Sequence, residues 1–175
     1  SKIKLFENLK TIGGNADFSN NFSSSTQNIE SILGSIKLLN SRIMELPKLN
    51  VIGGSFELRG SYLKSFGNIK SIGTNLDLVE GKIEDLGNLE EINGFVNFKG
   101  SQVKSLNKLK KIVLFANFSD SLVEDLGNLE SIGGNAYFNE TNIKSIGKLK
   151  YIGGFAQFGG NPTLEEQWGK VKNAE

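Results

Sequence analysis

The chain has 175 residues, of which 20 are Lys or Arg and 19 are Asp or Glu, so its net charge is +1. It contains no Cys and no His, which excludes disulfides, thiolate chemistry and the imidazole groups that most often serve as general bases and transition-metal ligands. The balanced charge gives no electrostatic attraction to nucleic acid or to an anionic membrane. No apolar run reaches the roughly 20 residues that a membrane-spanning helix needs.

A twenty-residue repeat runs without a gap from Ser1 to Gly160. When the sequence is written in rows of twenty, each residue has a column number. Column 12 is Ile in every row, and columns 3, 6, 9, 16 and 18 are apolar with two exceptions, Ser23 and Thr26. A strict period of this kind predicts a solenoid in which each row forms one coil, and stacked coils bury their apolar columns against one another.

Glycines mark the corners of the coil. Most of the 21 Gly residues fall in columns 13–14, 7 and 20, where we expect a positive φ or a close approach of backbone. Between corners, columns 15–19 alternate polar and apolar residues, as in Ser55–Arg59, which predicts a short strand. Columns 3, 6, 9 and 12 recur every three residues, which indicates extended or polyproline-like backbone.

After Gly160 the repeat stops, and the sequence predicts a helix over about 163–172. Thr163 and Glu166 have the spacing of a capping box. The apolar residues of one helical face are Leu164, Trp168 and Val171. We expect this helix to cover the last coil, with Trp168 as a lid on the core. At the other end Ser1 begins in register with no comparable cap, so an exposed first coil could pair with another copy end to end.

Basic and acidic coils alternate from residue 61 onward. Column 10 reads Lys70, Glu90, Lys110, Glu130, Lys150, and column 4 reads Lys64, Glu84, Lys104, Glu124, Lys144. Adjacent coils should lie about 4.8 Å apart, which places each Lys between acidic neighbours. We interpret the alternation as a device that fixes the register of stacking; a charged binding ridge is the alternative.

The repeat unit from Ile132 to Leu149 resembles the leucine-rich-repeat motif with one residue added at Gly133-Gly134. The Ile-Gly-Gly punctuation is similar to that of receptor L domains. Column 1 falls where the leucine-rich family keeps its Asn ladder, and here it holds Asn21, Ser41, Ser61, Ser101, Ser121, Thr141 and Asn161. The resemblance implies a right-handed solenoid and slightly favours an extracellular or cell-surface location for a soluble protein. It implies no binding residues, because the motif is structural.

We therefore predict a mainly β, right-handed, leucine-rich-repeat or β-helix-like solenoid. It comprises eight coils over 1–160 with one parallel sheet, followed by a cap over 161–175 that contains a short helix.

One surface feature stands out on the expected sheet. Its outward columns, 15, 17 and 19, are polar in the early rows and become rich in aromatic and amide residues later. The candidate binding residues are Phe95, Asn97, Phe115, Asn117, Tyr137, Phe155 and Gln157. Exposed aromatic patches are typical of contact sites. The alternative is that the Phe residues of column 15 are half-buried and only pack on one another between coils.

No catalytic constellation is visible, and we expect neither enzyme activity nor a cofactor or metal. The first hypothesis is a recognition module that binds a protein, or a glycan, through the sheet face. The second is a structural or assembly protein that acts as a spacer or stacks end to end through its uncapped first coil. We expect no nucleic-acid partner and no membrane insertion.

Overall fold

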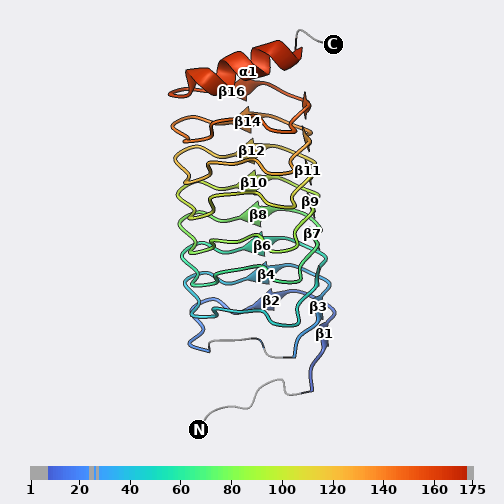
Figure 1. Ribbon diagram of the computed structural model, residues 1–175. Helices are drawn as coiled ribbons and strands as arrows, with labels where there is room; N and C mark the ends of the chain where they lie inside the picture. The colour runs from blue at the N-terminus through green and yellow to red at the C-terminus, as the bar shows by residue number, and fades with distance from the viewer. Residues whose placement is uncertain (1–7, 24–25, 27, 173–175) are drawn as a thin grey trace.

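The structure is a computed structural model that describes residues 8–172 apart from 24, 25 and 27. These residues form a parallel β-solenoid of about seven turns of about 20 residues, followed by one helix, α1 (Pro162–Lys172). The chain rises coil by coil toward the helix, which lies on the last coil (Figure 1). The mainly β solenoid is confirmed. We number the twenty-residue windows as coils 1 to 8; residues 1–7 of coil 1, and with them the expected open start at Ser1, lie outside the described residues.

Each coil contributes two strands of two residues, and these form two parallel sheets of eight strands. Sheet one, from columns 11–12, contains β1 (Thr11–Ile12), β3 (Ser31–Ile32), β5 (Val51–Ile52), β7 (Ser71–Ile72), β9 (Glu91–Ile92), β11 (Lys111–Ile112), β13 (Ser131–Ile132) and β15 (Tyr151–Ile152). Sheet two, from columns 16–17, contains β2 (Ala16–Asp17), β4 (Ile36–Lys37), β6 (Phe56–Glu57), β8 (Leu76–Asp77), β10 (Val96–Asn97), β12 (Ala116–Asn117), β14 (Ala136–Tyr137) and β16 (Ala156–Gln157).

The structure thus adds a second sheet to the single sheet expected from columns 15–19. The residues of columns 11 and 12 form this second sheet by pairing with the same columns of the next coil. Only the column 12 side chain points inward, so a strand of two residues shows no alternating pattern in the sequence. The strand at columns 16–17 is shorter than predicted because a turn begins at column 18. In coil 3 the Ser61 amide donates to the Leu58 carbonyl at 2.9 Å and closes this turn, with φ of 65° at Gly60.

The corners use the two backbone properties expected of glycine, at different places. Columns 20 and 7 have positive φ, for example 54° at Gly67, and the same conformation holds Asn107 at 49°. At column 13 the requirement is space instead: a Cβ added to Gly73 would overlap the Gly53 carbonyl oxygen of the coil before it. The Gly-rich corner therefore lets successive coils approach closely.

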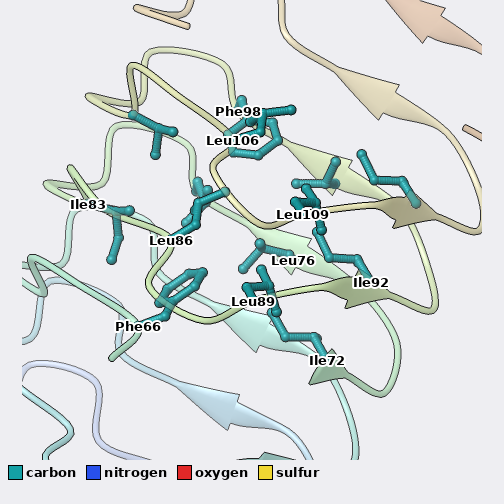
Figure 2. Close-up of a cluster of buried hydrophobic side chains, with 14 of the residues drawn as sticks. Phe66, Ile72, Leu76, Ile83, Leu86, Leu89, Ile92, Phe98, Leu106 and Leu109 are labelled. Atoms are coloured by element: carbon teal, nitrogen blue, oxygen red, sulfur yellow. The ribbon is translucent and has the colours of Figure 1, made fainter. Parts of the chain in front are cut away.

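The core is a set of continuous lines of equivalent side chains. Ile72, Ile92 and Ile112 are completely buried and lie opposite one another in the strand register. Figure 2 shows the inward side chains of neighbouring coils lying one above another. A second line consists of stacked rings at column 18, with centroids 5.1 to 5.3 Å apart, in Phe98, Phe118, Phe138 and Phe158. The stacking of same-column residues, on which the solenoid prediction depends, is confirmed.

Helix α1 caps part of this core. Leu164 is completely buried and Trp168 is 8% exposed, so the lid prediction is confirmed. The predicted capping box is wrong: the N-cap is Asn161, whose Oδ1 accepts from the Leu164 amide at 3.1 Å. Glu166 instead accepts a hydrogen bond from Lys170, at 2.8 Å. Within the described residues no helix is long and apolar enough to cross a membrane.

A single side chain of α1 continues the backbone ladder of the last coil. The Ile146 amide donates to Gln167 Oε1 at 3.0 Å, and Gln167 Nε2 donates to the Lys144 carbonyl at 3.0 Å. In inner coils these groups pair with the next coil, as when the Leu106 amide donates to the Asp125 carbonyl. The primary amide of Gln167 therefore replaces the missing coil at this side.

The charge alternation produces ion pairs between neighbouring coils, as predicted. Lys64 pairs with Glu84 in column 4, and Lys110 Nζ lies 2.7 Å from Glu90 Oε2 in column 10. The hydrogen bond and positive charge of Lys110 lower the pKa of Glu90, and Glu90 in turn raises the pKa of Lys110. The pairs are exposed, so each contributes little to stability; their role in fixing the register of stacking stays a prediction.

Candidate binding face

The predicted binding residues all lie on the outer side of sheet two, in coils 5 to 8. Columns 16 and 18 point into the core there, as the buried Val96 and Phe98 show, so columns 15 and 17 point outward. The in-register pairing places Asn97 opposite Asn117, and Tyr137 between Asn117 and Gln157. Residues 60 positions apart in the sequence are therefore brought onto one face.

Four aromatic residues form what we call the aromatic patch: Phe95, Phe115, Tyr137 and Phe155. The rings of Phe95 and Phe115 stack with centroids 4.7 Å apart and an interplanar angle of 6°. Tyr137 and Phe155 meet edge to face, at 5.4 Å and 89°. Phe115 is 38% exposed and Phe155 is 50% exposed, whereas Phe95 and Tyr137 are half-buried. The rings pack between coils and still leave apolar surface in contact with solvent.

The amide side chains beside the patch are held by hydrogen bonds to neighbouring groups. Asn97 Oδ1 accepts from the Lys99 amide at 3.1 Å, and Asn117 Oδ1 accepts from the Ser119 amide at 3.0 Å. Gln157 Oε1 accepts from Asn139 Nδ2 at 3.2 Å. In all three amides the oxygen is engaged within the protein, so the amide nitrogen is the group with capacity to donate to a ligand.

Leu114 extends the patch and was not among the predicted residues. It is 50% exposed and directly precedes Phe115. The sequence does carry a signal, because coil 6 has Val113-Leu114 at the corner where several other coils have Gly-Gly. An apolar residue that replaces a structural glycine at an exposed corner has no role in the repeat, which makes it a candidate contact residue.

Charge divides the outer side of sheet two into halves. In coils 1 to 4, columns 15, 17 and 19 carry ion pairs, such as Lys37 with Glu57 at 3.3 Å. In coils 5 to 8 the same columns hold a single ionisable side chain with a formal charge, Lys99, whose Nζ lies 3.4 Å from Asp120 Oδ2. Among the described residues no group of three or more His, Cys, Asp or Glu could hold a metal ion. The patch is apolar, amide-lined and almost uncharged.

Comparison with known proteins finds no matching family model, curated protein or solved structure. The parallel β-solenoid and the aromatic patch therefore rest on the residues and geometry of this chain alone.

A separate open depression of about 410 Å³ lies in columns 2 and 4, lined by Glu84, Gln102, Lys104 and Leu122. It shares no residue with the patch. Its lining side chains combine one acid, one base, one amide and one apolar group, which defines no reaction and no specific ligand chemistry.

Proposed function

We propose that the protein is a non-enzymatic recognition module that binds a protein partner through the aromatic patch and Leu114. The observation that carries this proposal is the concentration of exposed aromatic surface on one nearly uncharged half of an otherwise ion-paired sheet face. Apolar surface of this kind gains free energy when a partner removes it from water, and aromatic residues dominate the energetics of protein interfaces.

The ring geometry favours a polypeptide over a glycan. A sugar packs on an open ring face, and the stacking of Phe95 on Phe115 leaves each of these rings only one face for such a contact. Ring edges carry partial positive charge, and the neighbouring Asn97 and Asn117 contribute amide N–H donors. Backbone carbonyls and apolar side chains of a protein partner match this combination.

We also propose that the solenoid is related to leucine-rich-repeat proteins. Column 1, the position of the Asn ladder in that family, holds buried polar residues here, including Ser41 and Asn161. In the same column the hydroxyls of Ser61 and Ser101 are buried without a hydrogen-bond partner among the described residues. Asn161 Nδ2 donates to the Ile143 carbonyl at 2.8 Å, which is the kind of backbone contact that a buried ladder provides.

The test uses two double variants on the same face. F115S/F155S removes the most exposed rings, and K37S/E57S alters the ion-paired half as a matched control. Both are first checked for native circular dichroism, and each is then used with wild type to capture proteins from the source organism, with a glycan array in parallel. We expect a captured protein that is retained by the control and lost with F115S/F155S. Equal capture by both variants, or binding to glycans alone, would contradict the proposal.

A spacer role is the second candidate, and one observation favours it. Both sheets run without interruption through all eight coils, so the solenoid is a continuous rod. A spacer would tolerate F115S/F155S without loss of its interactions, which separates it from the recognition module in the same experiment.

A further inference from the structure

The C-terminal end of the solenoid is only half covered. Helix α1 covers the core on the side of columns 1 to 9, where Ile143 and Leu149 are each 2% exposed, although Ile146 stays half-buried. On the side of the two sheets the cover is less complete. Ile132 and Ala136 of coil 7 are completely buried, whereas the equivalent Ile152 and Ala156 of coil 8 are half-buried. An apolar surface bordered by two strands therefore remains accessible beside α1.

Strand β15 presents an unused hydrogen-bonding edge at this end. In coil 7 the carbonyls of Glu130, Ile132 and Gly134 accept from the amides of Lys150, Gly153 and Gly154, at 2.9 to 3.0 Å. The equivalent carbonyls of coil 8 belong to Lys150, Ile152 and Gly154. These accept no backbone hydrogen bond from any residue in the described range. Such an edge is a template for one more parallel strand.

The charge alternation specifies what that strand should carry. From coil 4 onward Lys and Glu alternate in column 10, so Lys70 borders Glu90, and Lys110 lies between Glu90 and Glu130. Lys150 is exposed and forms no ion pair with the described residues. An added strand should therefore hold an acidic residue in column 10. Coils 5 and 7, which border a Lys of this column, carry Glu90 and Glu130 there.

We propose that an extended, acidic segment of a protein partner adds in parallel to β15. Its amides donate to the carbonyls of Lys150, Ile152 and Gly154, its acidic side chain pairs with Lys150, and its apolar residue two positions later covers Ile152. The pattern is that of the protein's own acidic coils, Leu129-Glu130-Ser131-Ile132. This surface is distinct from the aromatic patch, so the two proposals stand or fall separately.

A second copy of this chain does not fit the edge in the repeat register. Its first coil would place Lys10 against Lys150, because both occupy column 10. Like charges at adjacent strand positions are destabilising. Self-association through β15 would therefore contradict the proposal.

The test is an NMR titration of the full chain with a synthetic peptide of residues 126–137. The matched control is the same peptide with Glu130→Lys. We expect the acidic peptide to shift the amide resonances of 150–154 and the control peptide to bind about tenfold more weakly. In the protein variant Lys150→Glu, which changes an exposed side chain, this preference should reverse.

Equal binding of the two peptides, no shift at millimolar peptide, or shifts confined to sheet two would overturn the proposal. So would concentration-dependent line broadening of the wild type that maps to β15, since it would make a second copy the occupant. Shifts confined to sheet two would instead place the peptide on the face of the aromatic patch, whereas the other outcomes leave capture through the patch unaffected.

Discussion

At the scale of single residues, Gly73 of coil 4 and Gly14 of coil 1 have unequal roles at the Gly-rich corner. A Cβ at Gly73 would overlap the Gly53 carbonyl, whereas a Cβ at Gly14 meets no atom within 4 Å. Neither residue has a positive φ, so backbone conformation does not distinguish them. The difference is that Gly73 packs against the backbone of coil 3, whereas no coil precedes Gly14 among the described residues.

We expect Gly73→Ala to lower the free energy of unfolding by about 1–3 kcal/mol, because the added methyl group forces neighbouring coils apart. Gly14→Ala is the matched control and should leave stability unchanged or raise it by up to about 1 kcal/mol, through a less flexible unfolded chain. Urea denaturation followed by circular dichroism measures both. Equal losses would show that the corner tolerates no side chain irrespective of spacing.

At the scale of elements, Gln167 shows how a helix can end a β-solenoid. Its amide accepts from Ile146 and donates to Lys144, and so satisfies both backbone groups that a further coil would have paired. The bond to the Ile146 amide is part-buried and the bond to the Lys144 carbonyl is exposed, so each contributes about 0.5–1.5 kcal/mol. One well-placed primary amide thus takes over both backbone hydrogen bonds at this side.

Gln167→Ala should therefore lower the free energy of unfolding by about 1 kcal/mol and speed hydrogen exchange at the Ile146 amide in particular. Glu165→Ala, at an exposed position of the same helix, is the control and should change neither quantity. Hydrogen exchange by NMR distinguishes the two effects. If Ile146 exchanges at the same rate in both variants, the capping role of Gln167 is wrong.

The ladder of Lys110 and Glu90 predicts a pH dependence with a definite sign. The pKa of Glu90 is lowered from its ordinary 4.5 by Lys110, so its stabilisation is present above that value and is lost as pH falls through the lowered pKa. The pKa of Lys110 is raised from 10.5, so its share is present below that value and is lost as pH rises through the raised pKa.

The melting temperature of wild type should exceed that of Glu90→Gln between about pH 6 and pH 9, and the two should converge at either extreme. The difference is small because the pair is exposed. Glu45→Gln is a control, since Glu45 forms no ion pair among the described residues. A difference that persists at acidic pH would assign the stabilisation to something other than charge.

The elements also show what a repeat can and cannot predict. Identical columns fixed the stacking of Ile72 on Ile92, because only a zero-shift register buries both. Sheet one was missed because a two-residue strand such as β7 has one inward side chain and no alternation. The outward direction of Phe115 followed from the columns, but its stacking on Phe95 depends on side-chain conformation. The identity of the partner cannot be predicted from the repeat, because the aromatic patch consists of residues that differ from the repeat pattern.

At the scale of the whole molecule, the order of charges along the rod opposes assembly end to end. Coil 8 carries Lys150 in column 10, and coil 1 carries Lys10 in the same column. The internal rule is the opposite one, with Lys10 beside Glu30 at 3.2 Å and Lys110 beside Glu90 at 2.7 Å. Contact between coil 8 of one copy and coil 1 of another would therefore place Lys next to Lys, against the alternation of charge within each copy. Helix α1 would also lie between the two hydrophobic cores.

We accordingly expect sedimentation analysis to give the mass of one chain over a hundredfold range of concentration at low salt. Lys150→Glu restores an acid opposite Lys10 and should raise the tendency to self-associate, with the increase weakened by added salt because exposed charges are screened over about 10 Å at 0.1 M. Lys148→Glu is the matched control, because it changes the net charge equally but lies in column 8. Wild-type oligomers that persist in both variants would show that the ends associate through contacts other than this ladder.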